Sequence, residues 1–323
     1  MSKALIAKVP GGPEVLEWVS LDPGAPGSGQ VLLRQTAIGV NFIDIYYRSG
    51  LYAWPETPLV IGAEAAGVIE AVGPDVSGLA IGDRVAYCTS TGAYRQSRVV
   101  AADRLVKLPD TISDQQAASI LLKGLTAQYL VTGSFRVEPG QTILVHAAAG
   151  GVGLLLGQWI SALGATVIGT VSTPEKAELA LAHGYHHVIN YRTEDFVARV
   201  REITGGAGCH AVYDSVGKDT WRGSLQSLRP LGSFVNFGQS SGPITDFKMS
   251  DLAAGSYSAI RPVLFHYVSD SAVLAERAKD LFERLESGRL KSDIAATFDL
   301  KDASEAHRRL EGRSSTGSMI LIP

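Results

Sequence analysis

A glycine-rich turn near the middle of the chain restricts the possible folds more than any other feature of the sequence. The apolar run Thr142–Ala147 leads into Gly150, Gly151 and Gly153, and the apolar segment Gly151–Leu163 follows at once. This order predicts a strand, a tight turn and a helix. Glycine lets the backbone turn sharply, and it lets a phosphate approach without a Cβ in the way. Because the first turn of a helix presents unpaired N–H groups, we expect this turn to bind the pyrophosphate of a dinucleotide.

Strand and helix signals alternate around this turn. The predicted strands are Thr142–Ala147, Thr166–Val171, His187–Asn190, Ala211–Ser215, Ser233–Phe237 and Ser256–Ile260. The predicted helices are Gly151–Leu163, Pro174–His183, Phe196–Thr204, Thr220–Leu228 and Met249–Ala254. Apolar strands that alternate with helices indicate a parallel sheet covered on both faces, and this strand number fits the doubly wound, or Rossmann, fold.

The chain before the turn is rich in short strands. They are predicted at Lys3–Val9, Val31–Ile38, Gly67–Val72, Arg84–Cys88 and Ala93–Val100, and a helix is predicted at Gln115–Leu130. Short strands separated by Gly, Pro and Asp turns favour a partly open barrel. The C-terminal helices Ser271–Ser287 and Ala303–Arg309 and the strand Ser318–Ile322 are expected to return to it. We therefore expect one domain from residues 1–123 and 262–323 and a second from residues 124–261.

Composition narrows the classes of protein that remain. The chain has 323 residues, of which 46% are hydrophobic and 19% charged, and its formal net charge is −3. These values fit a globular protein with a substantial core, and the lack of a basic excess makes nucleic acid an unlikely partner. Two cysteines without a CxxC exclude a disulfide scaffold and a cysteine-rich zinc site. The chain shows no signal-peptide pattern and no apolar run of membrane-spanning length, so we expect a cytoplasmic protein.

The end of the second Rossmann strand bears on the choice between NADH and NADPH. An NAD enzyme usually has Asp or Glu there, whereas this chain has Val171, Ser172 and Thr173. A carboxylate would repel the 2′-phosphate of NADPH, and small hydroxyls would not. Lys176, one turn into the next helix, could pair with that phosphate, although it could also be an ordinary solvated lysine. The strand end therefore predicts NADPH.

Three motifs resemble one family. The first is Gly140-Gln141, then Ala148-Ala149-Gly150-Gly151-x-Gly153, Gln158 and Ser161; the second is Gly62-Ala63-Glu64-Ala65-Ala66-Gly67; the third runs from Asn41 through Asp44 to Tyr46. They resemble the zinc-free quinone oxidoreductase and zeta-crystallin family of medium-chain dehydrogenases/reductases, over nearly the whole chain. The resemblance implies an α/β protein with a GroES-like, partly open β-barrel catalytic domain and a Rossmann cofactor domain. It also implies reduction of a quinone by NADPH in the interdomain cleft.

The sequence departs from the zinc alcohol dehydrogenases of the same superfamily. Ala63 stands where that branch has a histidine, and Asn41 stands where it has a cysteine ligand. Zinc requires three or four such ligands, so we expect no metal ion and no alcohol oxidation of that type. The histidines His183, His186 and His187 lie together at a helix-to-strand junction and are interpreted as surface residues.

A quinone needs positioning and hydrogen-bond donors rather than a metal. The candidate catalytic residues are Asn41, whose amide can donate without ionising, and Tyr46 and Tyr52, whose rings are both flat and polar. The two tyrosines could equally be aromatic packing around a loop. Asp44 could orient these groups or contact the cofactor ribose.

The resemblance implies further cofactor contacts. Thr126 and Tyr129 are expected at the nicotinamide or phosphate, Tyr191 near the adenine, and Phe265 near the nicotinamide. The turn residues Gly150, Gly151 and Val152 are expected at the pyrophosphate. Ser215, at the end of the fourth strand, and Phe237 and Gly238, at the end of the fifth, are expected where the loops meet the ligand. Arg313 is expected to approach a phosphate, with a solvated arginine as the alternative. The sixth strand is expected to pair with its copy across a two-fold axis, which predicts a homodimer.

Two other functions remain open at this stage. An NADPH-dependent reductase of enones or alkenals would use the same fold and cofactor, with a tyrosine as a possible proton donor. A cofactor-binding protein with a structural or RNA-binding role, as in some zeta-crystallins, belongs to a different class. No surface rich in both basic and aromatic residues supports RNA binding.

Overall fold

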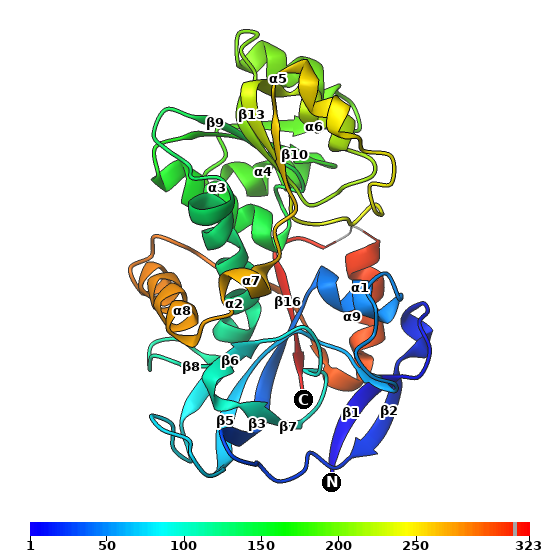
Figure 1. The fold of residues 1–323 in the computed structure, drawn as a ribbon, viewed down its shortest axis with the longest axis vertical. Helices are drawn as coiled ribbons and strands as arrows, with labels where there is room; N and C mark the ends of the chain where they lie inside the picture. The colour runs from blue at the N-terminus through cyan, green and yellow to red at the C-terminus, as the bar shows by residue number, and fades with distance from the viewer. Residues whose placement is uncertain (313–314) are drawn as a thin grey trace. The chain divides into compact units, whose positions relative to one another are not determined.

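The computed structural model describes residues 1–312 and 315–323, and these form two compact units. The first unit contains Met1–Lys123, Val268–Ser287 and Ser292–Pro323, and the second contains Gly124–Tyr267 and Gly288–Lys291. The chain thus leaves the second unit after Tyr267 rather than after Arg261. The ring of Tyr267 stacks on that of Tyr129, with centroids 4.4 Å apart, which holds this segment to the second unit. Figure 1 colours both units along the chain.

The second unit is a parallel sheet flanked by helices. Its strand order is β11-β10-β9-β12-β13-β14 in the part of the chain that the structure describes, and all pairs are parallel. The strands are β9 (Thr142–Val145), β10 (Thr166–Val171), β11 (His187–Asn190), β12 (Cys209–Asp214), β13 (Leu228–Asn236) and β14 (Ser258–Ile260). The helices are α3 (Gly151–Ala162), α4 (Pro174–Leu181), α5 (Phe196–Ile203), α6 (Trp221–Gln226) and α7 (Leu264–Tyr267), with a 3₁₀ turn at η4 (Met249–Ala254). The predicted doubly wound fold is confirmed.

Several elements of this unit differ by one or two residues from their predicted bounds, and the largest difference lies where α6 ends and β13 begins. Helix α6 ends at Gln226 rather than Leu228, and β13 already begins at Leu228 instead of Ser233. Leu228 pairs with Cys209, and an irregular register separates this pair from the regular ladder at Ala211. The irregular start of β13 therefore includes Leu228, which the prediction had assigned to the helix. Residues Met249–Ala254 form a 3₁₀ turn and not an α-helix.

The first unit consists mainly of antiparallel strands. The described residues form a sheet of order β2-β1-β4 and a sheet of order β15-β16-β3-β5-β6-β8, with β7 also paired to β3. The strands are β1 (Ser2–Ala7), β2 (Glu17–Leu21), β3 (Gln30–Val40), β4 (Leu59–Val60), β5 (Glu64–Val72), β6 (Arg84–Cys88), β7 (Ser97–Ala101), β8 (Leu105–Lys107), β15 (Ile294–Asp299) and β16 (Ser318–Ile322). The helices are α1 (Phe42–Arg48), α8 (Ser271–Glu286) and α9 (Ala303–Glu311). Helix α2 (Asp114–Tyr129, continued by a π turn at Leu130–Ser134) begins in this unit, and its residues from Gly124 onward belong to the second unit.

The end of the chain returns to the first unit, as expected, because β16 pairs with β3 through Met319 and Val40. The predicted strand Ala93–Val100 begins only at Ser97. Ala93 and Tyr94 instead donate their N–H groups to the carbonyls of Gly62 and Ile61. Helix α1 and four short strands (β2, β4, β8 and β15) were not predicted, because segments this short show too little periodicity.

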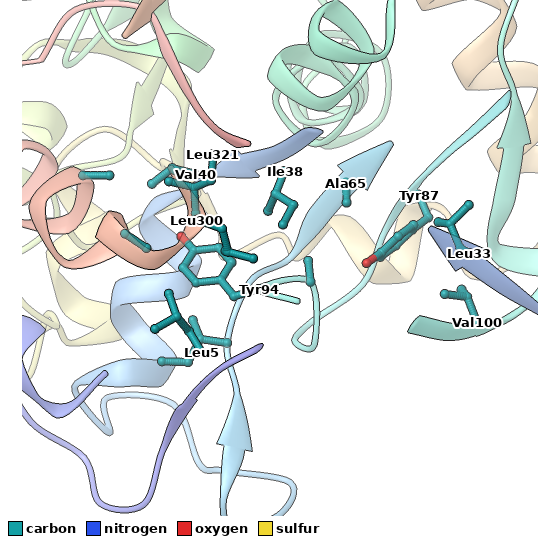
Figure 2. Packing of buried hydrophobic residues seen from close by; sticks show 14 of the residues in the cluster. Leu5, Leu33, Ile38, Val40, Ala65, Tyr87, Tyr94, Val100, Leu300 and Leu321 are labelled. Atoms are coloured by element: carbon teal, nitrogen blue, oxygen red, sulfur yellow. The ribbon is translucent and has the colours of Figure 1, made fainter. Parts of the chain in front are cut away.

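Tyr94 lies deep in the hydrophobic core of the first unit. Tyr94 is fully buried and belongs to the same apolar cluster as Leu5 and Leu300. Figure 2 shows its ring among these side chains, with the hydroxyl oxygen at the end of the ring that points away from the Tyr94 backbone. A buried tyrosine hydroxyl needs a hydrogen-bond partner, and this one reaches the polar cluster described below.

Candidate functional site

The glycine turn after β9 has the geometry of an anion site. Gly150 is the N-cap of α3, with φ −78° and ψ 166°, and no side chain of the described residues caps the helix. The N–H groups of the first helical turn therefore have no side-chain acceptor among the described residues. Because Gly150 and Gly151 have no Cβ, a ligand can approach these N–H groups. A helix of this length adds a positive dipole end to the same point. The backbone fits a pyrophosphate there.

Gly153 is needed for a different reason. A Cβ at this position would collide with the carbonyl oxygen of Ala147 and would lie 2.7 Å from that of Ala148. The backbone at Ala147 is itself in the left-handed region, with φ 54°. Tyr185 adds a hydrogen bond of 2.7 Å from its hydroxyl to the carbonyl oxygen of Gly153. Close packing of α3 on the turn thus requires glycine at position 153.

Several predicted cofactor residues gather at the carboxyl ends of the parallel strands. Tyr191 donates its backbone N–H to the carbonyl of Val171 at 3.1 Å, which places it beside the end of β10. A Cβ on Gly238 would lie 2.7 Å from the carbonyl oxygen of Ser215, so the loops after β12 and β13 touch. Phe237 donates its N–H to the carbonyl of Asp214 at 2.9 Å. Ligands of doubly wound sheets bind at this edge.

The end of β10 carries the residues predicted to select NADPH. Ser172 is buried, and Thr173 is the N-cap of α4, accepting the Lys176 N–H at 3.4 Å through its hydroxyl. Lys176 is half-buried. Glu175 is exposed at the helix start, where hydrogen bonds from its own backbone N–H and from Thr173 lower its pKa. A carboxylate in that position interacts favourably with the positive end of the helix dipole.

Thr126 and Tyr129 lie on α2 and are both buried. The stacking of Tyr129 on Tyr267 brings α7 against this end of α2, so that Phe265, on the same short helix, belongs to the same corner of the second unit. Arg313, the remaining predicted cofactor residue, lies outside the described residues.

In the first unit, Asn41 belongs to a buried polar cluster. It is the N-cap of α1, and its Nδ2 donates to Oε2 of Glu64 at 2.9 Å. Nζ of Lys123 lies 3.5 Å from the same oxygen, and Oε1 of Glu64 accepts the N–H of Leu122 at 2.7 Å. Burial raises the pKa of Glu64, while the Lys123 ammonium and the hydrogen bond from Asn41 oppose this shift. Gly39 makes room for the carboxylate, because a Cβ there would collide with it.

Asp44 lies one turn into α1 and is fully buried. Its Oδ2 accepts the backbone N–H of Asn41 at 2.8 Å and the hydroxyl of Tyr94 at 3.0 Å, whereas Oδ1 has no hydrogen-bond partner among the described residues. Burial raises the pKa of Asp44 to about 7, and the two hydrogen bonds oppose that shift. Because both oxygens are enclosed, the geometry favours the orienting role over a ribose contact.

Tyr46 and Tyr52 lie close together. Their ring centroids are 5.2 Å apart, and Tyr52 donates its N–H to the carbonyl of Tyr46 at 3.0 Å. Tyr46 is buried and Tyr52 is half-exposed. Tyr47 packs edge-on against Tyr52 at 5.5 Å. The packing interpretation and the substrate-binding interpretation therefore both remain compatible with this aromatic group.

Sequence reasoning missed the roles of Glu64, Lys123 and Tyr94. Glu64 appears in the sequence only as part of a motif, and no motif indicated a role for Lys123 or Tyr94. A buried lysine paired with a buried glutamate leaves no local pattern, since the two residues are far apart in sequence. The fixed spacing of Asn41 and Asp44 is the one signal that could have pointed to this cluster, since an acid three residues after an N-cap is a capping pattern.

Two further observations on the described residues concern metal sites and membrane-spanning helices. No group of three or more His, Cys, Asp or Glu side chains in residues 1–312 and 315–323 could hold a metal ion. In the same residues, no helix has both the length and the apolar character needed to span a bilayer.

Comparison with known proteins agrees with the fold and the motifs. Residues 27–110 match the family described as alcohol dehydrogenase GroES-like domain, and residues 151–279 match the family described as zinc-binding dehydrogenase. The chain is 48% identical to a quinone oxidoreductase of Pseudomonas aeruginosa, covering 100% of both proteins. It is 46% identical to a 2-haloacrylate reductase of Burkholderia sp, covering 100% of this chain and 99% of that protein. The solved structure of Escherichia coli quinone oxidoreductase complexed with NADPH gives a TM-score of 0.97 at 45% identity, covering 99% of this chain and 100% of that chain.

A GroES-like unit joined to a Rossmann unit defines a medium-chain dehydrogenase/reductase. Within that superfamily, the chain belongs to the quinone oxidoreductase family. The predicted fold class and the family resemblance are both confirmed.

Proposed function

We propose that this chain reduces a quinone to its hydroquinone with NADPH and without a metal ion. The observation that carries the proposal is full-length similarity, at a TM-score of 0.97, to a quinone oxidoreductase whose structure is complexed with NADPH. The glycine turn supports it, because α3 begins without a side-chain cap and fits a pyrophosphate.

The second unit provides the groups that would hold the cofactor. When bound, NADPH supplies a hydride, that is, two electrons and one proton. The turn residues Gly150, Gly151 and Val152 bind the pyrophosphate, and Lys176 pairs with the 2′-phosphate beside the hydroxyl of Ser172. The remaining contacts are proposed for Thr126, Tyr129, Tyr191, Ser215, Phe237, Gly238 and Phe265.

The first unit provides the groups that would act on the quinone. An amide nitrogen carries two protons, so Asn41 can donate one to Glu64 and the other to a quinone oxygen. Hydride addition leaves a negative charge on an oxygen of the reduced ring, and this donor stabilises it. The hydroquinone is complete once that oxygen takes one proton, which the hydroxyl of Tyr46 or Tyr52 can supply and recover from water.

The absence of a metal is proposed from the residue types at the matching positions. Ala63 is fully buried and has no ligand atom, and Asn41 already directs its amide to Glu64. The cation in this cluster is the ammonium of Lys123. Metal analysis of the purified protein should give far less than one zinc per chain, and a value near one would refute this part of the proposal.

The same site could reduce an activated alkene instead. A specific observation favours this alternative, namely the 46% identity to a 2-haloacrylate reductase over the full chain. In that reaction the hydride adds to one alkene carbon and a proton adds to the other, so a positioned proton donor matters more.

A substrate panel separates these reactions. NADPH oxidation should be followed with 1,4-benzoquinone, 9,10-phenanthrenequinone, 2-chloroacrylate and a simple enone, and each series repeated with NADH. We expect quinone turnover with NADPH at least tenfold faster than with NADH. Turnover of 2-chloroacrylate alone would assign the alkene reaction, and turnover of none of them would reject both.

We also propose a homodimer that forms through β14. This strand is an edge of the sheet as described, and its residues Ser258–Ile260 are all exposed. The exposed apolar residues Leu231, Met249 and Val263 lie near it in sequence or at the neighbouring strand. An exposed edge of this kind is commonly paired with a second copy. Sedimentation should give twice the chain mass, and Ser258→Pro, which removes a ladder donor, should give the monomer.

We expect the enzyme to work in a reducing cytoplasm. Both of its cysteines, Cys88 and Cys209, are free and buried, which suits a compartment where thiols stay reduced. Burial also raises the pKa of each thiol to about 12, so neither reacts readily.

A further inference from the structure

A buried series of hydrogen bonds runs from Arg48 to Asn41. Nη1 of Arg48 lies 3.0 Å from Nδ1 of His307, and Nε2 of His307 lies 2.9 Å from the hydroxyl of Tyr94. That hydroxyl lies 3.0 Å from Oδ2 of Asp44, which also accepts the backbone N–H of Asn41 at 2.8 Å. The first four of these side chains are at most 1% exposed. They come from α1, α9 and the segment before β7, so this series connects distant parts of the first unit.

The direction of each bond follows from chemistry. A guanidinium only donates, so Nδ1 of His307 must accept and carries no proton. The neutral ring then has its proton on Nε2, which donates to the oxygen of Tyr94. The single proton of the Tyr94 hydroxyl is left to donate to Asp44. Burial lowers the pKa of His307 to about 3, with the charge of Arg48 adding to the effect, so the ring stays neutral.

Several hydrogen bonds hold the guanidinium of Arg48, the first residue of the series, in place. Arg48 donates from Nη1 and Nη2 to the two carboxylate oxygens of Glu311 at 3.0 and 2.6 Å, and from Nε to the carbonyl of Gly11 at 3.1 Å. A planar guanidinium bound on two sides cannot rotate without breaking several bonds. The donor that sets the direction of the whole series is therefore fixed.

We propose that Tyr94, His307 and Arg48 are positioning residues of the reductase, which clamp the Asp44 carboxylate onto the backbone N–H of Asn41 and so fix the Asn41 side chain for the substrate. The inference rests on the proposed function, because it assigns the substrate contact to Asn41. Both donors meet on Oδ2 of Asp44, and its Oδ1 has no partner in the described residues. Loss of the Tyr94 hydroxyl would leave this buried carboxylate with one donor.

The charged and titratable groups around Asp44 come from several elements. They are Glu64 on β5, Lys123 on α2, Tyr94 before β7, Arg48 on α1 and His307 on α9. Lys123 and the hydrogen bond from Tyr94 favour the charged carboxylate, and Glu64 disfavours it. Of these, the Tyr94 bond can be removed by deleting one oxygen atom while the ring stays in the core.

The first test is therefore Tyr94→Phe. We expect kcat at neutral pH to fall about tenfold, the loss expected for one charge-assisted hydrogen bond, with KM for NADPH unchanged. Because Asp44 would lose a donor to its charged form, the acid limb of kcat should move to higher pH, and activity should partly return in alkaline buffer. Tyr87→Phe is the matched control, since Tyr87 is equally buried in the same core but bonds to Gln35 and Arg98. It should lower stability without moving the pH profile. A Tyr94→Phe profile that does not move, whatever the change in kcat, would overturn the proposal.

The second test compares two substitutions of His307. Gln can accept from Arg48 and donate to Tyr94 as the ring does, so His307→Gln should keep kcat within about twofold and leave the pH profile unchanged. His307→Leu has the bulk but neither polar atom, and it should lose about as much as Tyr94→Phe. A folded His307→Gln variant as impaired as His307→Leu would show that a titrating ring is required, which contradicts a positioning role.

A third measurement does not depend on catalysis. The ¹⁵N shifts of selectively labelled His307 should show a protonated Nε2 and an unprotonated Nδ1 from pH 6 to 9; the opposite tautomer would overturn the proposed direction. If the tautomer is as expected but the enzyme reduces no quinone, the proposed function fails while the bond direction stands. If quinones are reduced and Tyr94→Phe behaves as the unmodified enzyme, the positioning role fails by itself.

Discussion

The candidate site of the second unit consists mainly of backbone groups, whereas that of the first unit consists of side chains. In the second unit, the turn from Ala147 to Gly153 is almost all backbone, and its parts are neighbours in sequence. In the first unit, Asn41, Glu64 and Lys123 meet through side chains on β5, α2 and the start of α1. A backbone site tolerates changes in its surroundings but no added Cβ at its tightest point. A side-chain site depends on whether each buried charge keeps its partner.

The sharpest way to break the backbone site is Gly153→Ala. The added Cβ would collide with the carbonyl of Ala147, and backbone atoms cannot move aside as a flexible side chain can. We expect a loss of about 4 kcal/mol of unfolding free energy, above the usual range for overpacking, and no measurable NADPH binding. Gly150→Ala is the matched comparison, because its Cβ would meet only the Ala147 oxygen at 3.2 Å. Chemical denaturation and NADPH fluorescence titration of both variants provide the measurement; equal stabilities would contradict the explanation.

The corresponding break in the side-chain site is Lys123→Met. It leaves the carboxylate of Glu64 buried with neutral donors only, from Asn41 and Leu122. Removing one partner of a buried ion pair typically destabilises by about 3 kcal/mol. The double variant Glu64→Gln with Lys123→Met removes both charges and should recover much of that loss. Denaturation of the single and double variants measures the coupling, and strictly additive losses would mean that the pair does not interact.

The same contrast explains what the sequence could and could not predict. The glycine turn and the six parallel strands follow from local patterns, and the structure confirms both. The strand end at Ser172, which has no acid, predicted NADPH, and the similar quinone oxidoreductase complexed with NADPH agrees with that prediction. Asn41 and Asp44 were predicted as site residues because they share one short motif. Lys123, Tyr94 and His307 were not assigned any role, since only tertiary packing brings them to that motif. Short elements such as α1 and β15 were missed because seven residues or fewer carry little periodicity.

Two of the buried titrating groups of the first unit, Asp44 and His307, should affect stability with opposite signs. The pKa of His307 falls to about 3 on folding, so the unfolded chain binds its proton first and stability is lost as pH falls below about 6.5. The pKa of Asp44 rises to about 7, so the folded chain holds that proton and stability is lost as pH rises from about 4 to 7. Between pH 4 and 6.5 the two contributions oppose each other.

Substitutions should separate these contributions. Relative to the unmodified chain, the slope of unfolding free energy against pH should become more negative in His307→Gln and more positive in Asp44→Asn. Each change is limited to about 1.4 kcal/mol per pH unit, the value for one proton. Urea denaturation at half-unit steps from pH 4.5 to 6.5 would measure it. Slopes that shift in the same direction in both variants would show that the assigned pKa directions are wrong.

The smallest expected effect concerns Lys176, a side chain that is proposed to add to the cofactor site of the second unit. Lys176→Ala should weaken NADPH binding about fivefold, or roughly 1 kcal/mol, because a half-buried ammonium near a phosphate is partly screened by water. NADH binding should not change, since that cofactor has no 2′-phosphate. The Lys176 N–H still bonds to Thr173 through the backbone, so the start of α4 should be preserved. The ratio of the two dissociation constants, measured in the same buffer at low and high salt, tests the role of charge. If NADPH and NADH weaken equally, Lys176 supports the helix rather than the phosphate, and the choice of cofactor then falls to the backbone and Ser172.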